Sequence, residues 1–173
     1  RDLVRSRGLG DVYKRQDFDC IDALVMPGGE STTISKFMLA YGADDAVRKF
    51  AACGGRILAT CAGMVLAAKT GGGDVERSGQ TLLGLIDAEV SRNAFGRQRE
   101  SFEQDIPIPV LGGEPFHCIF IRAPCYTKIG AGVEVLARLD EKIIAVKSGK
   151  IIALSFHPEL SSDKRLLEYF LKL

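Results

Sequence analysis

The sequence has little of what several common classes of protein require. It contains no tryptophan, only two histidines, and five cysteines without a CxxC pair. An odd number of cysteines without paired spacing argues against both a disulfide framework and a zinc site. The apolar runs, such as Ile143–Val146, are far shorter than the ~20 residues of a membrane helix, and no apolar signal segment opens the chain. We therefore expect a cytoplasmic protein that binds no membrane, holds no metal or other cofactor, and keeps its cysteines reduced.

An excess of one charge is also lacking. The 23 basic and 22 acidic residues give a formal net charge of +1. Residues 1–16 hold five of the basic and two of the acidic residues, which leaves 18 basic and 20 acidic residues in the rest of the chain. A mildly acidic body offers no basic face to nucleic acid. With 46% hydrophobic and 26% charged residues over 173 positions, the chain is expected to form one globular domain.

The first 16 residues differ from all that follows. The segment RDLVRSRGLGDVYKRQ shows neither strand alternation nor a helical apolar stripe. We interpret residues 1–16 as a non-native or disordered N-terminal segment, with a native flexible tail as the alternative. The folded domain is predicted to cover residues 17–173.

From residue 17 the chain shows the rhythm of an α/β protein. Apolar runs of strand length alternate with helical patterns at Ala23–Met26, Ile34–Tyr41, Ala46–Ala52, Arg56–Thr60 and Ala62–Lys69. In the second half, successive strands are predicted at Leu82–Val90, Phe116–Ile121, Val133–Leu139, Ile143–Val146 and Ile151–Phe156, before a C-terminal helix at Asp163–Leu173. Short buried strands between helices predict a three-layer fold, with a mostly parallel central sheet and some antiparallel strands.

The chemistry of the chain is expected to centre on Cys61. The run Arg56–Thr60 is a strand that leads into a helical pattern starting at Ala62, with the cysteine at the junction. Such a sharp strand-to-helix turn needs small neighbours and projects a nucleophile from the sheet, and Ala62 and Gly63 are small. The amides and dipole of a helix N-terminus favour a thiolate. Taken alone, the segment also fits an ordinary buried cysteine at the end of a strand.

A cysteine nucleophile needs a base, and only two histidines are available. His157 follows the run Ile151–Phe156 and precedes Pro158, which favours an extended backbone at His157. In an extended stretch Glu159 shares a face with His157, so its carboxylate can orient the imidazole as the third member of a triad. His117 lies inside a predicted strand and is more simply a strand residue. The sequence therefore favours Cys61, His157 and Glu159.

A third segment supplies backbone amides near a helix start. In Met26–Thr33, with the sequence MPGGESTT, two glycines allow the chain to approach a ligand closely. Its amides can form an oxyanion hole together with the amide of Ala62. The spacing does not match a phosphate-binding P-loop. A turn followed by a helix cap from Ser31 or Thr32 is the simpler interpretation, and both can hold.

These segments together resemble a known family. PGGEST, TCAG, SRNAFGRQ followed by SFE, FIRAP and SFHPEL occur in this order. The combination resembles the PdxT-type glutaminase subunits of pyridoxal 5'-phosphate synthase, within the class I glutamine amidotransferases of flavodoxin-like fold. The resemblance covers the chain from about Asp17 to its end. TCAG with HPE alone would indicate only class I glutaminase chemistry. RNAFGRQ and FIRAP narrow the resemblance to the PdxT-type subunits.

The resemblance implies a function and roles for residues. Cys61 would be the nucleophile, His157 the general base and acid, and Glu159 the orienting carboxylate, with Gly29 and Ala62 in the oxyanion hole. Positions that match the glutamine-binding residues of the family are Gly29, Glu30, Ser31, Arg92, Ile121 and Arg122. The reaction would convert L-glutamine to L-glutamate and ammonia, without a cofactor. The ammonia would pass to a PdxS-type (β/α)₈ synthase subunit in a large heteromeric complex.

The sequence departs from the family pattern in two places, and alternatives stay open. Ala59 stands where the family has glycine. Residues 1–16 do not reproduce the first strand and helix of the family, and in the family that helix contacts the synthase. The alternatives are an amidotransferase that serves another synthase, a catalytically silent binding module and, less favoured, a cysteine protease or esterase. Without the motifs, Arg92, Arg97 and Arg122 would be taken as members of surface ion pairs.

Overall fold

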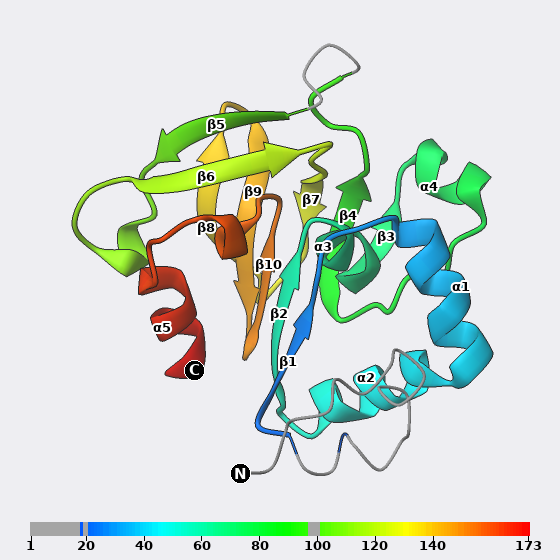
Figure 1. The fold of residues 1–173 in the computed structure, drawn as a ribbon. Coiled ribbons are helices and arrows are strands. Elements are labelled where there is room, and N and C mark those ends of the chain that lie inside the picture. The colour runs from blue at the N-terminus through cyan, green and yellow to red at the C-terminus, as the bar shows by residue number, and fades with distance from the viewer. Residues whose placement is uncertain (1–17, 19–20, 97–100) are drawn as a thin grey trace, which may run out of the picture.

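The structure is a computed structural model that describes residue 18, residues 21–96 and residues 101–173 (Figure 1). The segment of residues 1–16, predicted to be non-native or disordered, lies outside the described residues. The first described strand therefore begins at Ala23, in agreement with the sequence pattern.

A mixed sheet forms the centre of the fold. Its strands, in the order of the sheet, are β1 (Ala23–Met26), β2 (Arg56–Thr60), β10 (Ile151–Leu154), β9 (Lys142–Ser148), β7 (Cys125–Ile129), β4 (Ile86–Ser91) and β3 (Ala68–Gly71), while β8 (Glu134–Leu139) also pairs with β9. Strands β1, β2 and β10 run parallel to one another, as do β3 and β4. Strand β9 is antiparallel to β10, β7 and β8, and β4 is antiparallel to β7. The predicted α/β class, with parallel and antiparallel strands in one central sheet, is confirmed, although antiparallel pairings outnumber parallel ones among the described strands of this sheet.

Helices cover both sides of this sheet. They are α1 (Ser31–Tyr41), α2 (Ala43–Ala52), α3 (Ala62–Ala67), α4 (Gly73–Ser78) and α5 (Arg165–Leu171). In Figure 1, α1 and α2 lie on one side of the sheet and α5 on the other. A separate ribbon of β5 (Ser101–Ile106) and β6 (Phe116–Ile121) lies across the end of the sheet at which β2 and β10 end (Figure 1). The β5–β6 ribbon therefore covers this end of the sheet.

Several predicted elements are shorter than expected, and two of them are cut short by a change in the path of the chain. The helical pattern Ala62–Lys69 ends at Ala67, because the chain turns into the short strand β3. The strand predicted at Leu82–Val90 begins only at Ile86. Gly84 breaks that strand: it adopts φ +66°, a left-handed conformation that no regular strand contains.

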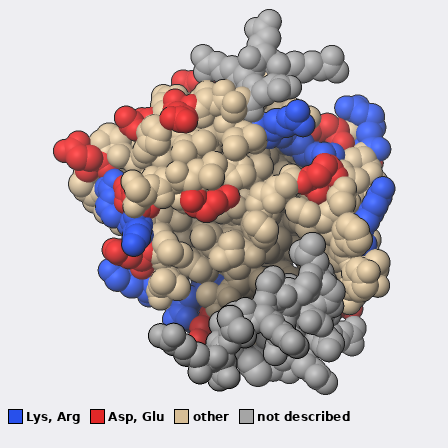
Figure 2. Space-filling view, viewed as in Figure 1, with Lys and Arg blue, Asp and Glu red and all other residues tan. Residues whose placement is uncertain are grey.

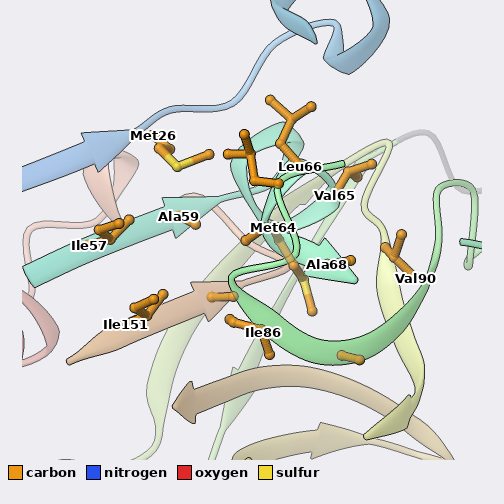
Figure 3. Close-up of a cluster of buried hydrophobic side chains, with 14 of the residues drawn as sticks. Met26, Ile57, Ala59, Met64, Val65, Leu66, Ala68, Ile86, Val90 and Ile151 are labelled. Carbon is orange, nitrogen blue, oxygen red and sulfur yellow. The ribbon is translucent and has the colours of Figure 1, made fainter. Parts of the chain in front are cut away.

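Alternate side chains of the central strands pack on opposite faces of the sheet, and both faces are buried. Ile57 of β2 belongs to the cluster on the side of α1 and α3, whereas Leu58 packs into the cluster beneath α5 and the ribbon. Ile151 and Ile152 of β10 divide in the same way. Figure 3 shows the first cluster, in which side chains of β1, β2, α3 and β10 converge. The period of two explains why continuous apolar runs are strands buried on both faces.

The surface agrees with the balanced composition. On the face drawn in Figure 2, basic and acidic side chains are interspersed around a mostly uncharged surface, without a continuous basic stripe. Among the helices of the described residues, none has the length and apolar character needed to cross a membrane.

Candidate active site

Cys61 lies at the strained junction between β2 and α3. Strand β2 ends at Thr60, α3 begins at Ala62, and Cys61 adopts φ 49° and ψ −106° between them. A non-glycine residue in such a conformation is rare and marks a functional constraint. The backbone amide of Cys61 donates to the carbonyl of Leu154 at 2.8 Å, which fixes the turn to the end of β10. The structure therefore has the sharp turn that the sequence predicted.

The tight turn explains why glycine follows at position 63. A Cβ atom at Gly63 would lie 2.2 Å from the carbonyl oxygen of Met26, which belongs to the backbone of β1. Backbone cannot move aside as a flexible side chain can. Gly63 therefore lets α3 approach β1, and this contact places Cys61 at the carboxyl ends of the parallel strands.

His157 and Glu159 lie beside each other just beyond the end of β10. Nδ1 of His157 is 2.8 Å from Oε1 of Glu159, and the backbone amide of His157 donates to the carbonyl of Ile119 in β6 at 2.9 Å. The segment Pro158–Leu160 is a 3₁₀ turn, so the contact arises in a turn and not in the extended stretch that was expected. The imidazole is mostly buried, whereas about half of the Glu159 side chain is exposed (52%). A carboxylate at Nδ1 leaves Nε2 as the free nitrogen of the ring.

Gly28 shows that the imidazole and the thiol side chain are neighbours. A Cβ atom at Gly28 would lie 2.4 Å from Cε1 of His157 and 3.4 Å from Cβ of Cys61. The two side chains thus flank one point in space, although 96 residues separate them in sequence. The structure brings together the three residues that the sequence singled out.

The protonation of His157 reflects this neighbourhood. The Cys61 side chain, and after it the Glu159 carboxylate, raise the pKa of His157 to about 9, against the opposing effect of burial. By strict hydrogen-bond geometry, Nε2 of His157 is buried without a partner among the described residues. The Cys61 thiol instead donates to the carbonyl of Ile121 at 3.7 Å. The raised pKa of His157 favours the transfer of a proton to the imidazole beside Cys61.

A cavity of about 430 Å³ opens beside Cys61, within the range of small-molecule sites. Its lining consists of Gly29, Glu30, Ser31, Cys61, Ala62, Val65, Arg92, Asn93, Arg122 and Pro124. All but one of the predicted glutamine-binding residues are in this set, and the exception, Ile121, accepts the thiol hydrogen bond. Val65, Asn93 and Pro124 were not predicted, because a buried valine, an asparagine and a proline carry no signal of their own in the sequence. Gly29 adopts φ +139°, which only glycine tolerates easily.

The polar side of the cavity is a pair of opposite charges. Nη2 of Arg92 lies 3.1 Å from Oε1 of Glu30. The Glu30 carboxylate also accepts from the amides of Thr32 at 3.2 Å and Thr33 at 2.7 Å, so Glu30 caps α1, and the cap predicted from Ser31 or Thr32 is wrong. Partial burial opposes ionisation of Glu30, but the hydrogen bonds from Thr33 and Thr32 outweigh it and lower its pKa to about 2. The cavity thus presents a permanent anion next to a cation.

His117 lies away from this site. It is exposed on β6, with Nδ1 2.7 Å from Asp105 and Nε2 3.1 Å from Glu103, both on β5. These two carboxylates raise its pKa. It does not line the cavity beside Cys61. Within residues 18, 21–96 and 101–173, no three His, Cys, Asp or Glu side chains are grouped to hold a metal ion.

A mixed α/β sheet with a strained cysteine, a histidine and a glutamate at its carboxyl edge has the arrangement of a hydrolase with a cysteine nucleophile. The model of the SNO glutamine amidotransferase family matches residues 7–173. This chain belongs to the SNO glutamine amidotransferase family.

Individual relatives agree with this assignment. The chain is 50% identical over 161 residues, 93% of its length and 80% of the relative, to pyridoxal 5'-phosphate synthase subunit PdxT of Pelotomaculum thermopropionicum. It is 55% identical over 153 residues, 88% of this chain and 78% of the relative, to the protein of the same name from Desulforudis audaxviator. A crystal structure of a glutamine amidotransferase superposes with a TM-score of 0.85 at 48% identity, covering 93% of this chain and 83% of the other.

Proposed function

We propose that this protein is a glutaminase that hydrolyses L-glutamine to L-glutamate and ammonia, and that the ammonia serves pyridoxal 5'-phosphate synthesis. The observation that carries the proposal is the strained Cys61 beside His157, which Glu159 orients, at the edge of a cavity with paired charges. The relatives named PdxT support the destination of the ammonia. The catalytic domain is proposed to be residues 17–173. The protein is proposed to act in the cytoplasm.

The charges of the cavity suit a free amino acid. Glutamine carries an α-ammonium and an α-carboxylate, so Glu30 is assigned to the ammonium and Arg92 to the carboxylate, with Arg122 as a second cation in the lining. Ser31 and the backbone of Ile121 complete the binding set. The side-chain amide of glutamine then extends toward Cys61. A peptide bond inside a chain offers neither terminal charge, which disfavours a protease.

The proposed reaction has two halves. The Cys61 proton, directed at the Ile121 carbonyl in the resting protein, passes to Nε2 of neutral His157, a transfer that the raised pKa of His157 favours. The thiolate so formed attacks the side-chain amide carbon of glutamine. The amides of Gly29 and Ala62 stabilise the resulting oxyanion. The tetrahedral intermediate collapses as the C–N bond breaks and His157 protonates the leaving nitrogen, which departs as ammonia and leaves a glutamyl thioester.

The second half consumes one water molecule. Neutral His157 removes a proton from water, which attacks the thioester carbon and displaces the Cys61 sulfur. Glutamate leaves, the proton returns to the sulfur, and the enzyme is restored. Glu159 keeps Nε2 directed at the reacting atoms throughout, because its carboxylate holds Nδ1. No cofactor enters either half.

The partner is proposed to be a PdxS-type (β/α)₈ synthase subunit in a large heteromeric complex. Support comes from the relatives, which are named as subunits of pyridoxal 5'-phosphate synthase. Ammonia is released at the carboxyl edge of the sheet, where a docked synthase can collect it. An amidotransferase that serves another synthase would show the same chemistry with a different partner.

The test is glutamate release from L-glutamine, measured for the protein alone and with a PdxS-type synthase. We expect activity with the synthase, and a loss of at least about 10³-fold in Cys61→Ala. Cys53→Ala is the matched control, because Cys53 is free and exposed and lies outside the cavity. Equal activity in wild type and Cys61→Ala would contradict the proposed chemistry. Activity that is stimulated only by a different synthase would show that the partner is not a PdxS-type subunit.

A further inference from the structure

Gln80 reaches the first turn of α1 from the segment that follows α4. Its Oε1 accepts a hydrogen bond from Ser31 Oγ at 2.9 Å and a longer one from Thr32 Oγ1 at 3.4 Å. The next residue strengthens the connection: the amide of Thr81 donates to Ser35 Oγ at 2.8 Å, and that hydroxyl donates to the carbonyl of Thr81 at 3.2 Å. Two adjacent residues thus hold one face of the helix start that borders the cavity.

Ser31 is the residue through which Gln80 can influence the cavity. Only 4% of Ser31 is exposed, yet it contributes to the lining beside Glu30. A serine hydroxyl has one proton to donate and two lone pairs that accept. Because the proton is used on Gln80, the oxygen can only accept a hydrogen bond from a group in the cavity. An acceptor suits an ammonium group, which only donates, and repels a carboxylate.

The orientation of the Gln80 amide decides this polarity. Its Nε2 is buried and has no hydrogen-bond partner among the described residues. A buried unpaired donor costs free energy that an apolar side chain of the same length would avoid. If the amide were reversed, its NH₂ group would donate to Ser31, and the Ser31 proton would be free to point into the cavity. The Gln80 oxygen therefore determines whether the Ser31 hydroxyl accepts or donates a hydrogen bond in the cavity.

We propose that Gln80 is a positioning residue that keeps the Ser31 hydroxyl as an acceptor and so directs the α-ammonium group of the substrate to the side of the cavity formed by Ser31 and Glu30. The inference rests on the proposed function, because it specifies how the same cavity orients an amino acid. Gln80 itself does not line the cavity and acts through Ser31.

The experiment compares two substrates in the complex with the synthase. One is L-glutamine, and the other is glutaramate, which is glutamine without its α-amino group. In Gln80→Met the freed Ser31 proton can point toward the ammonium group, so we expect KM for glutamine to rise, by up to about tenfold, with little change in kcat. The kcat/KM for glutaramate should stay within about twofold of wild type, because no ammonium is present to lose that bond.

Gln80→Glu tests the polarity directly. A carboxylate can only accept, so it holds the Ser31 proton as the glutamine oxygen does, and we expect KM for glutamine close to the wild-type value. Gln104→Met, at an exposed position of β5, is the matched control, and it should leave the kinetic constants for both substrates unchanged. Thermal unfolding of each variant identifies loss of folded protein.

The outcomes separate cleanly. Equal losses for glutamine and glutaramate in Gln80→Met would mean a purely structural role and would overturn the inference, as would no loss for either. If the wild-type protein shows no glutamine hydrolysis that depends on Cys61, the proposed function fails, and the inference fails with it. Wild-type activity with unchanged kinetics in Gln80→Met would refute the inference alone.

Discussion

Gly28→Ala offers a test of the active-site geometry that separates activity from stability. Gly28 does not adopt a positive φ, so alanine fits its backbone conformation. The added Cβ would lie 2.4 Å from Cε1 of His157, whereas an ordinary contact begins at 3.4 Å. The imidazole must therefore move by about 1 Å, and a displacement of that size can reduce the rate about 100-fold. Because a side chain rather than backbone gives way, the free energy of unfolding should fall by no more than about 1–3 kcal/mol.

The assay is glutamate release with the synthase, combined with urea unfolding of the isolated protein. We expect kcat to fall about 100-fold while the protein stays folded. Gly73→Ala is the matched control, because its Cβ would meet its nearest neighbour, Nη1 of Arg77, at 3.5 Å and its φ is not positive. Activity of Gly28→Ala within about threefold of wild type would show that His157 need not stay where the structure places it, and would refute the proposed role of its position.

Two further predictions concern stability. The pKa of His157 is raised from 6.5 to about 9, so its contribution to stability is fully present below pH 6.5 and is lost as the pH rises through 9. Urea unfolding at both ends of this window should show that loss in wild type and a smaller one in Cys61→Ala, which lacks the main cause of the shift; an identical pH dependence in both would contradict the assignment. Gly63→Ala places a Cβ 2.2 Å from a backbone carbonyl of β1 and should lower the free energy of unfolding by about 3 kcal/mol, and unchanged stability would show that β1 can move aside.

The nucleophile region could be predicted from sequence because its signals are local. An apolar strand, a cysteine and small residues at a helix start lie within a few positions of one another around Cys61. His157 was found because only two histidines compete and one of them is followed by Pro158 and Glu159. The contact between His157 and Cys61 depends on the sheet, which sets β2 beside β10.

Other parts of the site and fold carry no local signal. The bond between Ser31 and Gln80 joins residues 49 positions apart, and neither residue type indicates the other. Strand β5 was missed because most of its residues are exposed, so the sequence shows no alternation of apolar and polar positions. Strand β3 is four residues long and only its first residue is buried, so it was merged with the preceding helix.

Glu30 unites the start of α1 with the charge of the cavity. Its carboxylate accepts from two backbone amides and the Thr33 hydroxyl, and it pairs with Arg92. A pKa of about 2 keeps it ionised at every pH at which the protein is expected to work. Titration of Glu30 therefore does not contribute to the pH dependence of glutaminase activity near neutrality. The helix cap and the proposed substrate anchor are then one residue, so we expect a change at Glu30 to disturb the helix start and the binding of an ammonium group together.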